Sequence, residues 1–255
     1  MIGVMRSEWL KLRSVRSNVV VVLSIVFLSV GLGALLCGVI PTSGRDRGGE
    51  PSPLADPFDR LTFTLAGVQV AYLLFGVLGV QIIGQEYRFN TIRVTFAAVP
   101  RRFRVVGAKL VVLVAVTLVV AAFTIAVALG VASLILSARG VPVDFGIPEA
   151  GRFLVGSLIL GLVYSVAGFG VGAILRQPIG AIVFVLVWPL LIENLLDGFL
   201  HSSVGRWLPY RGGQLLLSRV PDPELFSPWA GFAYFCGFAA LVTVIGAALV
   251  NSRDA

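Results

Sequence analysis

Six apolar runs, each long enough to cross a lipid bilayer, take up most of the sequence. A membrane-spanning helix needs about 20 apolar residues. Hydrophobic residues make up 57% of the 255 residues and charged residues only 13%, a balance that excludes a soluble domain of this length. We predict an all-α, polytopic membrane protein with a single transmembrane domain over residues 1–255. The six spans are expected at residues 19–40, 61–84, 110–136, 153–175, 179–197 and 229–250.

Basic residues indicate how these spans are oriented. Six spans place both termini on the same side of the membrane. The segments on that side carry twelve basic residues and the opposite segments carry eight. Cytoplasmic loops are enriched in Lys and Arg, so we expect both termini in the cytoplasm. The net charge of +7 does not indicate a nucleic-acid partner, because the positive charge lies in short loops beside apolar spans.

Lysine is rare among the basic residues. Only two of the 20 basic residues are lysines, Lys11 and Lys109; the others are arginines. We interpret the excess of arginine as codon bias in a GC-rich bacterium and attach no function to it.

The segment between the second and third spans is the most basic of the inner segments. Between Glu86 and Lys109 it carries six positive charges and one acid. Asn90 can cap a short helix, on which Ile92 and Phe96 share one face because they are four residues apart. Such an apolar knob suits a groove on a soluble partner. The alternative is a solvated loop whose arginines attract anionic lipid.

Two further segments have amphipathic composition. In residues 1–18, Trp9 and Leu10 stand among basic residues, which is typical of a helix lying in the plane of the inner headgroups; a basic flank that merely orients the first span is the alternative. The outer segment 198–228 contains Trp207 and Tyr210, and we expect it to lie in the interface or to re-enter the outer leaflet.

No motif for catalysis or for metal or nucleotide binding is present. The chain has no GxxxxGK[ST] loop, and His201 is its only histidine, so no Ser/His/Asp set exists. Cys37 and Cys236 have neither metal-ligand nor disulfide spacing and are expected to be buried thiols. We therefore expect that this chain is not an enzyme and carries no cofactor or metal.

Three patches of sequence, taken in order, resemble the bacterial ABC-type exporter permeases of the type 2 family. The resemblance extends over nearly the whole chain, with one departure at Phe89-Asn90, where the family often has a short Gly-containing turn. The matching positions are Ser7 to Arg13 in the head; Glu86-Tyr87-Arg88, Thr91-Ile92-Arg93, Thr95, Pro100, Arg102 and Lys109 in the basic loop; and Leu208-Pro209 with Gly213-Gln214 in the last outer segment.

The resemblance implies which subunits this chain assembles with and which of its segments contact them. Two such membrane domains, identical or different, would pair above two separate ATPase subunits that hold ATP and Mg. The head would be a connecting helix, and the loop 86–100 would hold a coupling helix that fits a cleft in the ATPase. The implied connecting-helix residues are Glu8, Trp9, Lys11 and Arg13. The implied ATPase-interface residues are Glu86, Tyr87, Arg88, Thr91, Ile92, Arg93, Thr95, Phe96, Arg101 and Arg102.

A few polar residues within the spans are candidates for the translocation path or for structural roles. Gln69 and Tyr72 could line the path, or they could hydrogen-bond to neighbouring helices. Glu193 and Asp197 lie four apart near the outer end of the fifth span. They could mark a substrate exit or a subunit interface, because acids inside a membrane usually face protein or water; alternatively, the span ends there and both acids reach the headgroups.

Small residues predict where helices approach closely. Gly76 and Gly79 lie in the second span, and Gly168 and Gly172 form a small-xxx-small pair in the fourth. Such residues let two backbones come together in a membrane.

We predict the permease subunit of an ATP-driven exporter, whose unknown cargo is hydrophobic or amphipathic because polar residues in the spans are few. The alternative is a membrane transporter that needs no ATPase, or a membrane scaffold or interaction protein. Ion-coupled transport normally uses carboxylates or broken helices at mid-membrane, and only Glu193 comes near that position.

Overall fold

The computed structural model describes residues 2–42, 52–89, 91, 102–199, 205, 207–219 and 226–252. These residues form helices and connecting loops, with no strand among them. Six helical segments are long and apolar enough to cross a membrane, so the prediction of an all-α polytopic membrane protein is confirmed.

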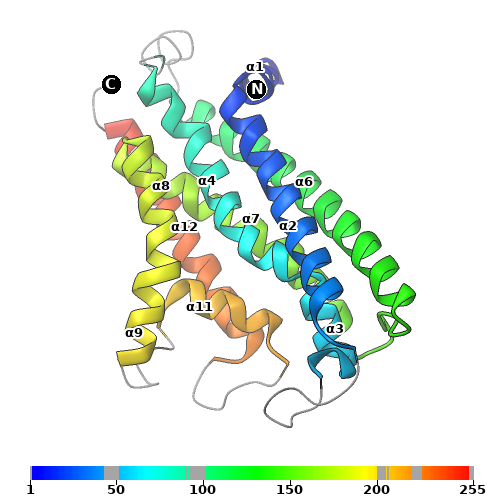
Figure 1. Ribbon diagram of the computed structural model, residues 1–255. Coiled ribbons are helices and arrows are strands. Elements are labelled where there is room, and N and C mark those ends of the chain that lie inside the picture. Colours follow the sequence, from blue (N-terminus) through cyan, green and yellow to red (C-terminus); the bar gives the residue numbers. More distant parts are fainter. Residues whose placement is uncertain are drawn as a thin grey trace.

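The helices run lengthwise in one bundle, with shorter helices at its two ends (Figure 1). The long helices are α2 (Arg16–Val39), α4 (Ala66–Arg88), α6 (Arg102–Ala138), α7 (Ala150–Leu175) and α12 (Pro228–Ser252). The shorter helices are α1 (Ile2–Ser14), α3 (Pro57–Thr64), α8 (Pro178–Val187), α9 (Asn194–Phe199) and α11 (Pro209–Gln214). Two 3₁₀ turns, η1 (Pro53–Ala55) and η3 (Leu215–Leu217), and the π-helical segment η2 (Trp188–Glu193) complete the described part.

Two of the expected spans are interrupted. The second consists of α3 and α4, which are separated at Leu65, whose backbone is not helical. The fifth is α8 continued through η2 into α9, and η2 contains Pro189. Proline lacks the N–H that an α-helix needs at this point, which accounts for the wider turn.

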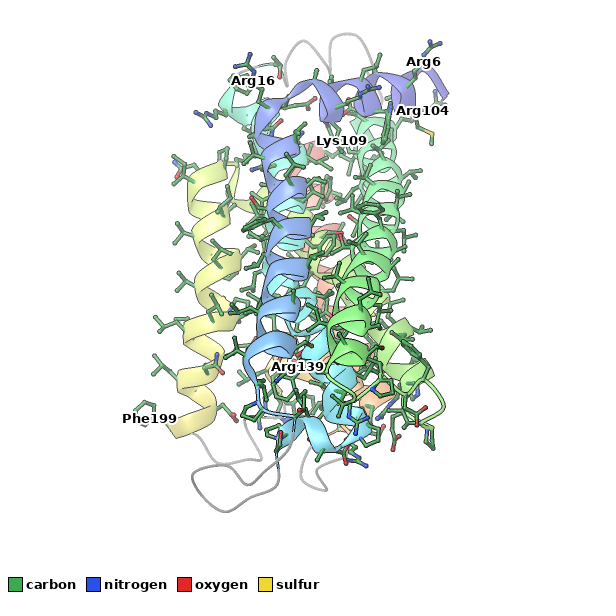
Figure 2. All side chains as sticks on the ribbon, turned by 45° about the vertical axis from the view of Figure 1, so that its right-hand side comes forward. Arg6, Arg16, Arg104, Lys109, Arg139 and Phe199 are labelled. Atoms are coloured by element: carbon green, nitrogen blue, oxygen red, sulfur yellow. The ribbon has the colours of Figure 1, made fainter. Side chains whose placement is uncertain are left out.

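Helix α6 is longer than a bilayer requires. Its 37 residues span roughly 55 Å at about 1.5 Å per residue, against about 30 Å of hydrocarbon. The extra length of α6 extends its first turns, with Lys109, to the end of the bundle where α1 lies. The first and last described residues are at this same end (Figures 1 and 2).

Helices α4 and α7 form the centre of the bundle. They are the most buried of the candidate spans, whereas α2, the span that begins with α8, and α12 bury only a small share of their residues. The exposed side chains on these outer helices include Phe27, Ile179 and Val244, as expected where lipid is the solvent.

The expected close approach of small residues is confirmed between α4 and α7. A Cβ atom added at Gly168 would collide with the backbone of Gly76, and one added at Gly79 would collide with the backbone of Ser165. Because backbone atoms cannot move aside as a flexible side chain can, these glycines set the distance between the two central helices.

Replacing one of these glycines should destabilise the bundle. We expect Gly168→Val to lower the free energy of unfolding by at least about 1–3 kcal/mol, the usual cost of overpacking a core. Thermal unfolding in detergent measures the effect. The matched control is Gly130→Val on α6, where an added Cβ meets no atom within 4 Å. Equal stability of the two variants would contradict the packing argument.

Candidate functional site

Helix α1 lies across one end of the bundle rather than along it (Figure 2). Its Trp9 and Leu10 are exposed, while Glu8 on the same helix is buried. Arg6, Arg16, Arg104 and Lys109 gather at this end of the molecule (Figure 2). A helix with exposed apolar and basic side chains that crosses the bundle end suits the headgroup region of a membrane.

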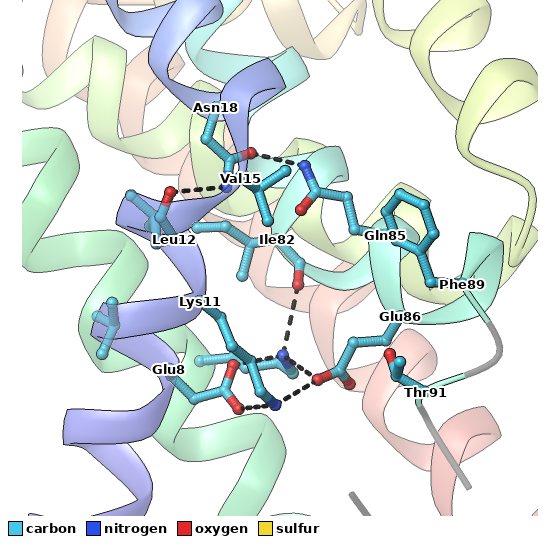
Figure 3. A pocket seen from close by; sticks show the side chains of 12 residues that line it. Glu8, Lys11, Leu12, Val15, Asn18, Ile82, Gln85, Glu86, Phe89 and Thr91 are labelled. Atoms are coloured by element: carbon cyan, nitrogen blue, oxygen red, sulfur yellow. Dashed lines mark hydrogen bonds and ion pairs between the residues drawn. The ribbon is translucent and has the colours of Figure 1, made fainter. Parts of the chain in front are cut away.

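Four charged side chains meet where α1, α4 and α6 come together (Figure 3). Glu8 and Lys11 come from α1, Glu86 from the last turn of α4, and Lys109 from the start of α6. The Lys109 Nζ lies 2.5 Å from Glu8 Oε2 and 3.0 Å from Glu86 Oε1. The Lys11 Nζ lies 2.7 Å from Glu8 Oε1 and 2.8 Å from Glu86 Oε1. We call these four residues the inner tetrad, because the orientation expected from the basic residues would place them on the cytoplasmic side.

The inner tetrad is electrically balanced, with two ammonium groups and two carboxylates. Lys109, Glu8 and Glu86 are buried, and Lys11 is partly exposed. Burial lowers the pKa of Lys11, but hydrogen bonds with Glu8 and Glu86 and the charges of those carboxylates outweigh burial, so its pKa is raised above the ordinary value. Buried ions persist only when partners compensate for lost hydration, so each member of the tetrad depends on the others.

A second polar contact fixes the corner between α1 and α2. The Asn18 side-chain amide donates to the carbonyl oxygen of Leu12 at 3.1 Å. The Gln85 Nε2 donates in turn to Asn18 Oδ1 at 2.7 Å. Gln85, the residue before Glu86, thus attaches this corner to α4.

The last turn of α4 has another partner on its other side. The guanidinium carbon of Arg176 lies 5.5 Å from the centroid of the Tyr87 ring, a cation–π contact. The Arg176 Nη2 also donates to the Leu249 carbonyl oxygen of α12 at 2.9 Å. Arg176 caps α7 in the left-handed conformation, with φ of 55°, which is uncommon for a residue other than glycine. Glu86 and Tyr87 therefore connect α4 to different sets of helices.

A cavity of about 240 Å³ lies beside the inner tetrad (Figure 3). Its walls are mostly apolar and include Leu12, Ile82 and Val112, while Phe89 and Thr91 stand at the side where α4 ends. The amide of Thr91 donates to the Glu86 carbonyl oxygen at 3.0 Å, so the chain leaving α4 turns beside this cavity.

The structure brings together only part of the residue set expected at this end. Of the implied connecting-helix residues, Glu8 and Lys11 enter the tetrad, whereas Trp9 and Arg13 are exposed and stand outside it. Glu86 and Tyr87 make the contacts given above, and Arg88 packs over the Phe89 ring at 5.7 Å. Ile92, Arg93, Thr95, Phe96 and Arg101 lie outside the described residues, as does the side chain of Arg102.

Sequence reasoning included Lys109 in the family pattern without giving it a role, and it did not identify Asn18, Gln85 or Arg176 as members of this site. One signal was available: the only two lysines of the chain are the two cations of the tetrad. Their rarity was interpreted as codon bias alone, and the structure gives both of them a specific role.

Glu193 has a structural partner at the opposite end of the bundle. It is buried, and its carboxylate accepts hydrogen bonds from the backbone amides of Tyr210 and Arg211, at 3.2 and 2.9 Å. These amides belong to the first turn of α11, where helix N–H groups lack intrahelical partners. Glu193 thus caps α11, whereas the more exposed Asp197 forms an ion pair with Arg211.

The two candidate path residues of the second span lie near that same end. Gln69 and Tyr72 both line a cavity of about 430 Å³ between α3, α4, α7 and the α11–η3 segment. Tyr72 also stacks on Tyr164, with ring centroids 5.5 Å apart. Within the described residues, no group of three His, Cys, Asp or Glu side chains could hold a metal ion.

Comparison with known families adds an independent finding. A family model described as ABC-2 family transporter protein matches residues 4–191, which is more than half of the chain. The match begins in α1, ends within η2 and includes all four members of the inner tetrad. No curated protein matches the chain.

Removing one buried cation should show how strongly the tetrad depends on charge balance. We expect Lys109→Met to destabilise the protein by about 3–5 kcal/mol, because it leaves two buried carboxylates to share Lys11 alone. Thermal unfolding in detergent provides the measurement. Lys11→Met should cost less, because that side chain is partly exposed.

A charge-balanced double variant tests the cause of that loss. Lys109→Met combined with Glu8→Gln leaves the pair of Lys11 and Glu86, so it should be more stable than Lys109→Met alone. If the double variant is instead less stable by the sum of the two single effects, the tetrad is not a coupled unit.

Proposed function

Because the chain belongs to the ABC-2 family of transporter proteins and is a permease subunit of an ABC transporter, we propose that it exports a compound at the expense of ATP hydrolysed elsewhere. The family is a membrane transport component and is not itself catalytic. Permeases of this family generally work with an ABC ATPase. Two ATPase subunits and a second permease, in a bacterial plasma membrane with both termini in the cytoplasm, complete the proposed assembly.

The inner tetrad is the observation that carries this proposal. The expected coupling segment leaves α4 just after Glu86 and enters α6 shortly before Lys109. Both ends of the segment are therefore attached to the same four charges, and the tetrad also holds α1. A push on the segment by a docked ATPase would move the ends of α4 and α6 together with α1 as one unit.

A second route leads to the other half of the bundle. Tyr87, next to Glu86, contacts Arg176 at the junction of α7 and α8, and Arg176 holds the inner end of α12. Movement of the last turn of α4 would reach these three helices through Arg176. The cycle we propose is a rocking of the spans between inward-open and outward-open states, driven through both routes.

An ion-coupled mechanism has less support. It would use an ionisable group that is available to a transported ion. Glu193, the nearest candidate, is occupied by two backbone amides and also accepts from Trp188 Nε1 at 3.1 Å. This supports a structural role for Glu193 and leaves an ATPase as the energy source we favour.

The proposed docking of an ATPase can be tested on the coupling segment itself. We expect the double variant Phe96→Asp and Arg93→Glu to abolish co-purification of the ATPase subunit, because it places acids on the proposed apolar knob and its basic flank. Pull-down in mild detergent measures the association, and size-exclusion chromatography checks that the permease remains folded.

The control makes the same chemical changes in segments proposed to lie outside. Phe145→Asp with Arg47→Glu should leave co-purification unchanged. Retention of the ATPase by the Phe96/Arg93 double variant would contradict docking at this segment.

Transmission of movement can be separated from docking. We expect Glu86→Gln to retain the ATPase but to suppress the movement of α1 on nucleotide binding, because the tetrad loses one of its carboxylates. A fluorescent label at residue 6, introduced as Arg6→Cys with Cys236→Ala, reports the response to a non-hydrolysable ATP analogue. Arg13→Gln, which neutralises an exposed charge on α1 outside the tetrad, should respond normally. A full response from Glu86→Gln would refute transmission through the tetrad.

A further inference from the structure

The outer cavity has the size and lining of a small-molecule site. Its volume is about 430 Å³, within the usual range of about 300–1,000 Å³ for ligand pockets. It lies between α3, α4, α7 and the α11–η3 segment, and α3 and α11 are at the end of the bundle opposite to α1 (Figure 1). The site is therefore distinct from the inner tetrad.

Aromatic side chains form one part of the wall. The rings of Phe58 and Phe153 meet edge to face with centroids 5.6 Å apart, and Tyr72 also lines the cavity. Tyr72 is only 1% exposed, and its hydroxyl is buried next to Ser157, so the ring and not the hydroxyl is the part that belongs to the wall. Aromatic faces also attract cations.

The charged groups around the cavity favour a cation. Arg211 and Arg219 both line it, but each has a carboxylate partner, Asp197 and Asp56 respectively. The remaining charged group of the lining, Asp59, has no ion pair or side-chain hydrogen bond among the described residues. Together with Asp56 and Asp197, which stand outside the lining, these charged groups comprise three acids and two bases. Asp59 interacts with Arg219 through its charge but forms no ion pair with it, and it lines the cavity beside the aromatic rings.

We propose that this outer cavity binds an organic cation, an amine or quaternary ammonium group carried on an apolar body. Asp59 neutralises the positive charge, and the rings of Phe58, Tyr72 and Phe153 surround the ammonium group and its apolar part. The amide of Gln69, which also lines the cavity, supplies hydrogen-bonding groups. The claim that such a cation is the cargo rests on the proposed export function, whereas the binding itself does not.

Asp59 also has a simpler structural explanation. It lies in the first turn of α3, where an acid interacts favourably with the helix dipole. That role requires no ligand and predicts only a small loss of stability when the charge is removed. Binding affinity therefore separates the two explanations, and stability does not.

The test is a binding measurement on the full chain in nanodiscs of phosphatidylglycerol, with empty nanodiscs as the baseline. The probe is benzyltrimethylammonium, which joins a quaternary ammonium group to one aromatic ring, and isothermal titration measures its affinity. The anion phenylmethanesulfonate, which has the same ring and the opposite charge, should not bind. We expect Asp59→Asn to weaken binding of the cation by about tenfold or more, as loss of a partly desolvated charge pair does.

A matched variant makes the result specific. Asp144→Asn removes an exposed acid outside the cavity and should leave affinity unchanged. Absence of binding above the baseline, or unchanged affinity in Asp59→Asn, would overturn the proposal.

Binding in nanodiscs of different lipid composition shows whether the natural cation is a lipid headgroup or a soluble amine. Part of the phosphatidylglycerol is replaced either by phosphatidylethanolamine or by the same fraction of uncharged diacylglycerol, so that the negative surface charge is diluted equally. Weaker probe binding with phosphatidylethanolamine identifies the lipid ammonium group as the natural occupant, whereas equal binding identifies a soluble amine. No nucleotide or ATPase takes part in these measurements. A negative result would therefore leave the coupling proposal intact, and loss of ATPase docking in the Phe96/Arg93 variant would leave the cavity proposal intact.

Discussion

Charge neutralisation at the end of the bundle that carries α1 is the constraint on which the arrangement of α1, α4 and α6 depends. A buried carboxylate or ammonium group is tolerated only beside an opposite charge. Glu8, Glu86 and Lys109 are buried on three different helices, so none of these helices can shift alone without separating charges. The requirement holds α1 across the bundle end, where apolar packing alone would leave a short amphipathic helix free to settle elsewhere in the headgroup region.

The same constraint would let an apolar bundle transmit the movement that we propose an ATPase begins outside the membrane. Lipid-facing helices gain little from one another by the hydrophobic effect, because lipid is equally apolar. Directional polar contacts are therefore the means by which particular helices can be made to move together. The last turn of α4 has two such contacts, through Glu86 to α1 and α6 and through Tyr87 to Arg176. The glycine contacts between α4 and α7 add a rigid centre.

Much of the fold could be predicted from the sequence, but only part of the site. Apolar length alone indicated six spans, because hydropathy is a local property of each segment. The interruption at Leu65 was not foreseen, and Pro189 was an overlooked signal for the interruption in α8–α9. The tetrad could not be found by spacing, because Glu8 and Lys109 are 101 residues apart. Such a pair becomes visible only when α1 is folded back over the bundle. The role of Glu193 was hidden for the same reason, since its partners lie on α11.

The choice of lysine at both cationic positions of the tetrad follows from geometry. An ammonium group is a compact charge whose donors can point to several acceptors, whereas a guanidinium group is planar and suits two parallel bonds to one carboxylate. Each lysine of the tetrad contacts two carboxylates from different helices. Lys109 also directs a hydrogen bond to the Ile82 carbonyl oxygen at 3.4 Å. In a chain that otherwise uses arginine throughout, the two lysines occur where one cation must join acceptors on separate helices.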